Sequence, residues 1–193
     1  MLPEPIAVTL QVADALERVG VPYLIGGSLA STIHGVVRAT LDADILAELT
    51  LHQAQPFADL LAGTFYLDRA TIQDAIRQRT SFNVIHLATM FKVDVFVSKG
   101  RPFDRQMLAR RQPWVVDPDA GRLIYVATPE DTVLTKLAWY RSGGEVSDRQ
   151  WRDVLGVLIV QGDRLDFAYM RQWATDLSVL DLLERALDET ARP

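Results

Sequence analysis

Residues 23–46 read YLIGGSLASTIHGVVRATLDADIL, and this stretch decides the fold. The apolar run 23–25 comes before Gly-Gly-Ser at 26–28, a sequence typical of a short buried strand, a tight turn and the N-cap of a helix. That helix is expected over 29–34. Residues 41–46 carry aspartates at alternate positions, which predicts a second strand with one apolar face and one face that carries both aspartates. The stretch therefore predicts a strand, a glycine turn, a short helix and a strand, in that order.

The rest of the chain divides into a strand-rich part and a helical part. Apolar residues at helical spacing predict an N-terminal helix, and alternation predicts strands at 81–87 and 91–97 that are joined by a tight connection. A turn signal at 117–121 predicts a hairpin, whereas 70–79 is only weakly helical. From Thr128 onward the pattern is helical.

These patterns predict an α+β fold. We expect a mixed β-sheet flanked by helices over residues 1–126, and a helical part over 127–193 that packs on it without an independent linker. A capping box at Ser147 and Gln150 begins one of the C-terminal helices. Its apolar spacing indicates that Ile159 is buried with the other apolar side chains of that helix.

Composition restricts the chemistry and the location of the protein. The 193 residues include no cysteine and three histidines, which excludes a cysteine nucleophile and thiolate metal sites and argues against a histidine-rich zinc site. Any metal is expected to have oxygen ligands, which favours Mg²⁺ or Mn²⁺. The net charge of -5 argues against binding nucleic acid by bulk electrostatics. No apolar run approaches the roughly 20 residues that span a bilayer, and we expect a cytoplasmic protein with no membrane partner.

Three aspartates are candidates for metal chemistry. Asp42 and Asp44 share one face of a predicted strand, with their side chains roughly 6 to 7 Å apart. At an effective dielectric constant near 20, two carboxylates at that distance repel by about 3 kcal/mol, so a fold gains nothing from them without a neutralising cation or arginine. Asp94 lies in the centre of another predicted strand, where a charge needs water, a partner or a metal. In the alternative interpretation, the pair is the polar face of an edge strand, and Asp94 pairs with Lys92 or an arginine.

Gly26, Gly27 and Ser28 also have two interpretations. Glycines between a strand and a helix N-terminus let backbone N–H groups approach a phosphate, and the helix dipole adds attraction. The alternative is a tight turn with an N-cap serine. The motif is not a P-loop, because no Gly-Lys-Ser/Thr follows, and it lacks the third glycine of a dinucleotide-binding fingerprint.

In combination, these motifs resemble the polymerase-β-like nucleotidyltransferase superfamily, in which a Gly-Gly/Ser turn is followed by Asp-x-Asp and by a third carboxylate on a neighbouring strand. The chain has this order in Gly-Gly-Ser at 26–28, Arg38-x-Thr40-x-Asp42-x-Asp44, and Asp94. The helical part carries Pro129-Glu130-Asp131, Lys136-Leu137, Arg141, Asp148 and Asp153. It looks like the tail of the bacterial subgroup that includes abortive-infection and toxin–antitoxin nucleotidyltransferases. The resemblance covers residues 20–160.

The resemblance implies a nucleotidyltransferase that moves an NMP group from an NTP to a hydroxyl acceptor by two-metal, in-line phosphoryl transfer. Asp42 and Asp44 would bind two Mg²⁺ (or Mn²⁺) ions that also grip the triphosphate. Asp94 would hold the metal near the attacking hydroxyl and help to remove its proton. All three are therefore both catalytic and metal-binding candidates.

The resemblance also implies a set of nucleotide-binding residues. Gly26, Gly27 and Ser28 would contact the phosphates, and Lys136 would reach the triphosphate from the helical part. The alternative for Lys136 is a solvated lysine on a helix face. Asp153 and Arg141 are expected to belong to a structural ion network that ties the helices together.

The acceptor and the biological role have several candidates. The candidate acceptors are an RNA such as tRNA, a protein and a small molecule. The family resemblance favours the role of a toxin in a toxin–antitoxin or phage-defence pair, with a cognate antitoxin as partner. The alternative function is a catalytically silent interaction module that uses the same fold as an antitoxin or regulator. His34 follows the glycine turn, where it either contacts a substrate or packs in the interior.

Overall fold

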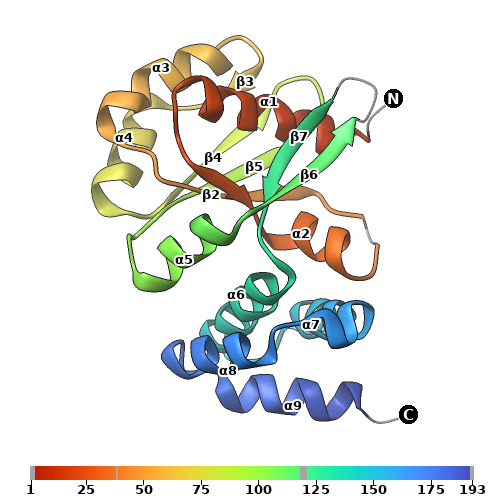
Figure 1. The fold of residues 1–193 in the computed structure, drawn as a ribbon. Coiled ribbons are helices and arrows are strands. Elements are labelled where there is room, and N and C mark those ends of the chain that lie inside the picture. The colour runs from red at the N-terminus through yellow and green to blue at the C-terminus, as the bar shows by residue number, and fades with distance from the viewer. Residues whose placement is uncertain (1–2, 38, 118–120, 192–193) are drawn as a thin grey trace. The chain divides into compact units, whose positions relative to one another are not determined.

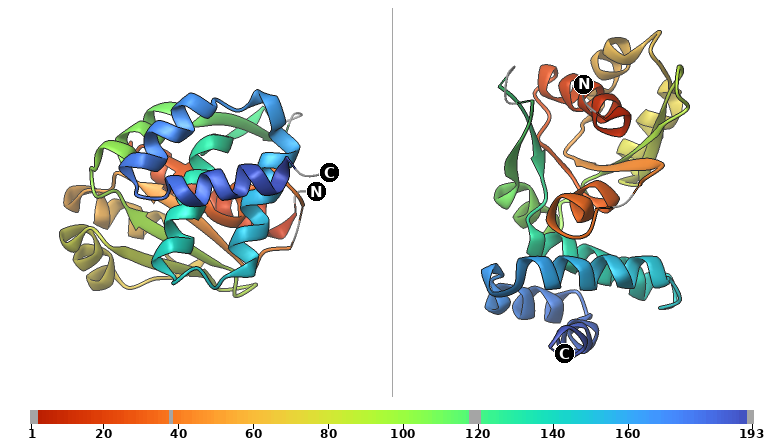
Figure 2. Two further views of the ribbon diagram at one scale, coloured as in Figure 1. Left: turned by 90° about the horizontal axis from the view of Figure 1, so that it is seen from below. Right: turned by 90° about the vertical axis from the view of Figure 1, so that its right-hand side faces the viewer.

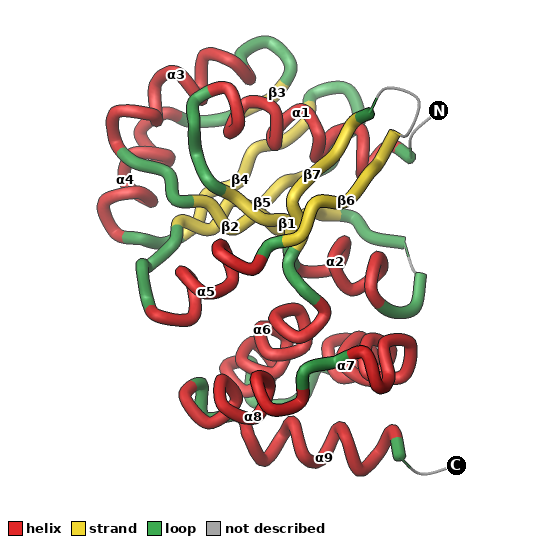
Figure 3. The backbone as a smooth tube through the Cα atoms, viewed as in Figure 1, coloured by secondary structure: helices red, strands yellow, loops and turns green. Residues whose placement is uncertain are grey.

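The computed structural model describes residues 3–37, 39–117 and 121–191. The chain divides into two compact units. The first contains residues 1–26 and 40–126 and holds the β-sheet, and the second contains residues 27–39 and 127–193. Among the described residues of the second unit there are helices but no strand, as Figure 3 shows.

The first unit contains a seven-stranded sheet in the order β3-β4-β5-β2-β1-β7-β6 (Figure 1). The strands are β1 (Tyr23–Ile25), β2 (Asp42–Ala47), β3 (Phe65–Tyr66), β4 (Ser81–His86), β5 (Lys92–Val97), β6 (Gln112–Asp117) and β7 (Arg122–Val126). The pairs β2–β5 and β1–β7 are parallel, and the other neighbours are antiparallel. The predicted mixed sheet of an α+β fold is therefore confirmed, as are the strands on either side of the turn at 117–121, whose residues 118–120 lie outside the described ranges.

Nine α-helices accompany these strands within the described residues, and a 3₁₀ turn covers Gly162–Arg164. The first unit has α1 (Glu4–Arg18), α3 (Leu51–Leu61), α4 (Arg69–Gln78) and α5 (Pro102–Arg110). The second unit has α2 (Gly27–His34), α6 (Pro129–Ser142), α7 (Asp148–Gln161), α8 (Phe167–Asp176) and α9 (Leu180–Thr190). Within these described ranges, no helix combines the length and the apolar character that crossing a membrane requires.

One face of the sheet is packed. On β2 and β5, every second residue is fully buried, including Ile45 and Val95 at 0% exposure. Phe82 on β4 is the register partner of Val95, and its ring meets that of Phe57 from α3 at 6.1 Å between centroids. Because aromatic side chains bury a large apolar area, this contact fixes α3 to the face that carries Val95. Helices α1 and α4 lie on the same side of the sheet as α3 (Figure 1).

In the second unit, α2 packs against α6 and α7. The contact with α7 depends on Gly35, because a Cβ atom there would lie 2.9 Å from the backbone nitrogen of Val157. A side chain at residue 35 would push the two backbones apart, so glycine allows their close approach. Figure 2 shows the helices of this unit from two further directions.

The weak helical pattern at 70–79 corresponds to a regular helix, and the expected burial of Ile159 is wrong. Residues 69–78 form a regular helix, because Asp68 caps it by accepting hydrogen bonds from the backbone of Ala70 and Thr71. Ile159 is 65% exposed. Helix α7 buries Trp151, Val154, Val157 and Leu158, and a helix turns by about 100° per residue, which carries residue 159 off that buried stripe.

Candidate active site

The three candidate aspartates lie on one face of the sheet. Asp42 and Asp44 are on β2 and Asp94 is on β5, and the parallel register pairs Asp44 with Asp94 and Asp42 with Lys92. Neighbouring strands are about 4.8 Å apart, and partners in register point to the same side. This side is opposite the packed face, because the buried residues of both strands occupy the alternate positions. The strand order therefore brings together acids that are 50 residues apart in sequence, from 44 to 94.

A lysine lies within this acidic face. The Nζ atom of Lys92 is 2.7 Å from Oδ2 of Asp94, and the two side chains are 40% and 20% exposed. The hydrogen bond with Asp94 raises the pKa of Lys92, burial opposes this, and the negative charges of Asp94, Asp42 and Asp44 reinforce it. Pairing of Asp94 with Lys92, which the sequence left open as an alternative, is therefore present. The signal for it was the spacing of two residues on one strand, which places both side chains on one face.

Polar neighbours complete this face. Thr40 donates its hydroxyl hydrogen bond to the backbone oxygen of Asp42 at 2.8 Å, and its Oγ1 is also 3.2 Å from Oδ1 of Asp42. Arg38, from the same motif, lies outside the described residues. Asn83 on β4 is the register partner of Asp94. Sequence reasoning did not identify Asn83, because its position beside Asp94 follows only from the pairing of β4 with β5.

The donor set has the chemistry that a hard divalent ion prefers, since three carboxylates on one face supply only oxygen ligands. The side chains are not gathered about one point, however. Among the described residues, no group of three or more aspartates, glutamates or histidines is placed so that it could hold a metal ion. Asp94 instead faces the ammonium of Lys92. The residues therefore fit a divalent ion by type and by register, and a change of side-chain rotamers is needed to bring their oxygens together.

Gly26 follows the end of β1 and contacts the neighbouring strand β2. The backbone N–H of Gly26 donates to the backbone oxygen of Asp44 at 2.9 Å. Gly27 has a φ of +53°, in the left-handed region that glycine adopts without a steric penalty. Helix α2 begins at Gly27, so Gly26 occupies the N-cap position, and Ser28, which was predicted as the N-cap, lies two residues later in the first turn and is buried. The expected strand, turn and helix are present.

Lys136 lies on α6 in the second unit. Its Nζ is 2.8 Å from Oδ2 of Asp153 on α7, and the two side chains are only 10% and 9% exposed. The solvated alternative for this lysine is therefore wrong. The ion pair joins α6 to α7, and Arg141 of α6 pairs with Asp181 of α9, so both residues of the predicted network tie helices together.

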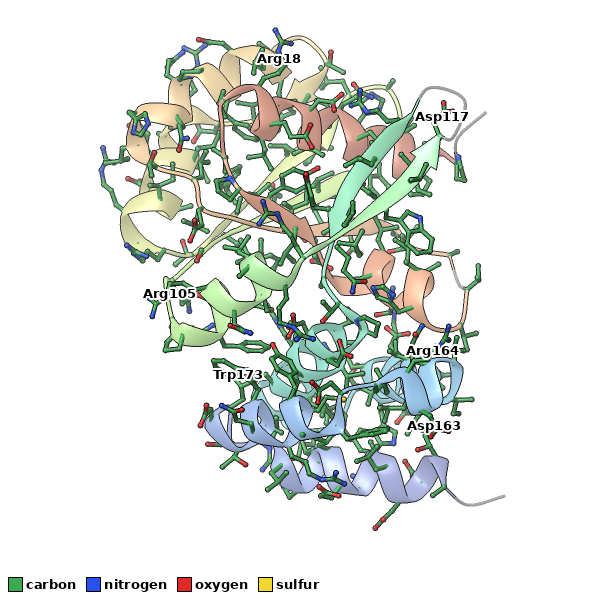
Figure 4. All side chains as sticks on the ribbon, in the orientation of Figure 1. Arg18, Arg105, Asp117, Asp163, Arg164 and Trp173 are labelled. Carbon is green, nitrogen blue, oxygen red and sulfur yellow. The ribbon has the colours of Figure 1, made fainter. Side chains whose placement is uncertain are left out.

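The sequence leaves two interpretations for His34, and also for the basic segment 99–111, which either contacts a tRNA or nucleotide phosphate or forms a solvated helix face. His34 is buried, and its Nε2–H donates to the backbone oxygen of Ala127 at 2.7 Å, which favours the packed interpretation. In the basic segment, Arg105 is exposed on α5 (Figure 4), as expected of a solvated helix face.

Acidification is expected to destabilise the protein through His34. Burial lowers the pKa of its imidazole, and the hydrogen bond to Ala127 and the charge of Glu130 oppose this only in part. The unfolded chain, with a pKa near 6.5, therefore takes up a proton more readily than the folded one. The contribution is complete above about pH 6.5 and is lost as the pH falls through the folded pKa.

Urea unfolding of the wild type and of His34→Gln, in neutral and mildly acidic buffer, measures this effect. The variant should lose less stability on acidification than the wild type. His52, exposed on α3, provides the control, since His52→Gln should keep the wild-type difference. An equal loss in His34→Gln and the wild type would show that His34 is not the titrating group.

Comparison with solved structures places this geometry in a known fold. A nucleotidyltransferase-like antigenic protein from Paracoccidioides brasiliensis superposes with a TM-score of 0.56 at 17% identity, over 93% of each chain. The antibiotic-resistance factor ANT(2'')-Ia superposes with a TM-score of 0.57 at 12% identity, over 93% of this chain and 96% of that one. Its complex with adenylyl-2''-tobramycin gives a TM-score of 0.51 at 14% identity, over 94% of this chain and 97% of that one.

The chain has the fold of these nucleotidyltransferase structures. No protein-family model matches the chain, and no curated protein matches its sequence. At these sequence identities, the similarity shows that the chain shares the fold of these proteins. Activity, acceptor and membership of the toxin–antitoxin subgroup are separate proposals, which depend on the residues that this fold carries.

Proposed function

We propose that the protein is a nucleotidyltransferase that moves an NMP group from an NTP to a hydroxyl acceptor. The observation that carries this proposal is the acidic face, where Asp42, Asp44 and Asp94 lie on adjacent parallel strands of a nucleotidyltransferase fold. Like charges in register do not stabilise a sheet, so their placement is better explained by a ligand than by the fold.

The proposed roles follow from the chemistry of phosphoryl transfer. Asp42, Asp44 and Asp94 would hold Mg²⁺ or Mn²⁺, which supplies positive charge that offsets the negative charge of the triphosphate and of the departing pyrophosphate. The acceptor oxygen forms a bond to the α-phosphorus, and the bond from that phosphorus to the β-phosphate oxygen breaks. Asp94 accepts the proton that the acceptor hydroxyl loses. Thr40 holds the start of β2 in place by its hydrogen bonds to Asp42.

The glycine turn is proposed to bind the phosphates. The N–H of Gly26 is already bonded to Asp44, so the donors offered to a phosphate are the N–H groups of Gly27 and Ser28 at the start of α2. Gly26 contributes by having no side chain. A Cβ atom there would meet, among the described residues, only Cδ1 of Leu24 at 3.9 Å, so the fold itself does not require glycine at this position.

Gly26→Ala is therefore expected to keep the stability of the protein and to weaken Mg²⁺–NTP binding by about tenfold, because the added methyl group obstructs the approach of the phosphates. Isothermal titration with a non-hydrolysable NTP analogue, together with urea unfolding, tests both parts. Gly27→Ala is the matched comparison. It should lose about 1 kcal/mol of stability, because alanine is strained at the φ of +53°. If Gly26→Ala bound Mg²⁺–NTP with wild-type affinity, the glycine turn would not be part of the proposed site.

A transfer assay tests the proposed function directly. The protein is incubated with Mg²⁺, each α-labelled NTP and one acceptor class at a time: total cellular RNA including tRNA, proteins, or hydroxyl-bearing small molecules. Aminoglycosides belong in the last class because a solved structure of this fold holds an adenylylated tobramycin. Label transfer that is absent from the Asp42→Asn/Asp44→Asn double variant supports the proposal. No transfer to any class with all four NTPs would count against it.

The second candidate is an interaction module without turnover, and one observation favours it. The ammonium of Lys92 already pairs with Asp94, as in a site that has no need of a metal. Tight nucleotide or protein binding without label transfer would support this candidate. The finer proposal of a toxin with a cognate antitoxin is tested by expression in bacteria, where the wild type and not the double variant should arrest growth.

A further inference from the structure

We propose that Lys92 is a built-in competitor of the divalent ion, which holds the Asp94 carboxylate until a metal displaces it and so sets the metal concentration at which the site fills. This inference rests on the proposed function and deepens it, because it gives Lys92, which is not one of the three carboxylates, a role in setting the metal affinity. It makes the affinity of the site for Mg²⁺ or Mn²⁺ a property of four side chains instead of three.

The first step is that the two cations need the same carboxylate group. Nζ of Lys92 is 2.7 Å from Oδ2 of Asp94, which is a hydrogen-bonded ion pair. Mg²⁺ binds carboxylate oxygens at about 2.0–2.1 Å. An ammonium and a divalent ion that shared this carboxylate at such distances would repel each other strongly. Metal binding through Asp94 therefore requires the ammonium to move away.

The second step is that the positive charge of Lys92 compensates the negative charges of all three aspartates. It is the register partner of Asp42, and Asp94 is the register partner of Asp44, so the four residues form a two-by-two block on adjacent strands. One positive charge in that block offsets part of the repulsion among three negative charges. A divalent ion that enters the block replaces this compensation, so its net gain is smaller than it would be on three carboxylates alone.

The third step is that Lys92 is able to leave. Its side chain is 40% exposed and lies on the face opposite the packed core. A lysine presents a single compact charge on a flexible four-carbon stem, whereas an arginine would grip the carboxylate with two parallel hydrogen bonds. The ion pair is therefore a contact that exchange can break, since the lysine side chain is in part accessible to solvent.

Mn²⁺ binding without nucleotide tests the inference independently of catalysis. Free Mn²⁺ is measured by electron paramagnetic resonance during titration of the wild type, Lys92→Met and Lys92→Arg. Lys92→Met should bind Mn²⁺ at least tenfold more tightly than the wild type, because the competing charge is gone and the stem is retained. Lys92→Arg should bind it more weakly. Lys99→Met is the matched control, since this exposed lysine follows the opposite end of β5 and should leave the affinity unchanged.

The outcomes separate the two proposals. Mn²⁺ binding that is equal or weaker in Lys92→Met than in the wild type overturns the role of Lys92 and leaves the metal site of the proposed function standing. Mn²⁺ binding that is absent from the wild type and both Lys92 variants overturns the metal site as well. Thermal unfolding with and without Mn²⁺ confirms that each variant is folded, and Lys92→Gln replaces Lys92→Met if the apolar stem disturbs the sheet.

Discussion

Replacing Asp44 by asparagine is expected to reduce nucleotidyl transfer on the order of a thousandfold, the loss seen when one preorganised charge-stabilising group is removed from an active site. Asp44 is the central residue of the acidic face, because it is in register with Asp94 and its backbone oxygen accepts the N–H of Gly26. Asparagine keeps the shape and that backbone contact but removes the negative charge. The measurement is the rate of label transfer at saturating Mg²⁺ and NTP.

The same substitution should leave stability unchanged or raise it slightly. Asp44 and Asp94 are like charges in register, and removing one of them relieves repulsion that the fold does not need. Glu48→Gln is the control, since Glu48 is exposed just beyond the opposite end of β2 and its change should affect neither property. An Asp44→Asn protein that is folded and transfers label at the wild-type rate would exclude Asp44 from the chemistry. One that unfolds would show that the acid is structural.

The sequence was sufficient to predict the architecture for a physical reason. Strands with one packed face leave a period-two pattern, and the aspartates at 42 and 44 marked the unpacked face of β2. Glycine marked where an element ends, as Gly35 does after α2, and proline marked where one begins, as at the start of α6. These signals are local, and therefore they can be read from the sequence without knowing which strands are neighbours.

The partners of the candidate site residues were harder to predict, because they depend on pairing across the chain. Asn83 comes beside Asp94 only through the register of β4 with β5. The burial of Lys136 follows from the packing of α7 on α6, which a helix pattern alone does not specify. The grouping of residues 27–39 with the C-terminal helices was also not foreseen, since α2 follows a strand of the sheet in sequence.

Lys136→Met is expected to lower the free energy of unfolding by about 3–5 kcal/mol, the cost of breaking a buried ion pair by removing one partner. Asp153 keeps its negative charge in a position that is 9% exposed, and it loses the ammonium that lies 2.8 Å away. Urea unfolding at neutral pH measures the loss. Arg171→Met gives the comparison with an exposed ion pair, since Arg171 and its partner Glu184 are 52% and 44% exposed. That variant should lose far less stability, because solvent already screens the charges.

The double variant Lys136→Met/Asp153→Leu then separates structure from nucleotide binding. Replacing both charges by apolar side chains of similar volume should restore most of the stability that Lys136→Met loses, because both charges of the buried ion pair are then removed together. If Lys136 also reaches the triphosphate, the double variant will be stable but will bind Mg²⁺–NTP more weakly than the wild type. If the lysine serves only to join α6 to α7, the double variant will be stable and will bind NTP as the wild type does. A double variant that stays as unstable as Lys136→Met would contradict the assignment of the instability to the broken ion pair.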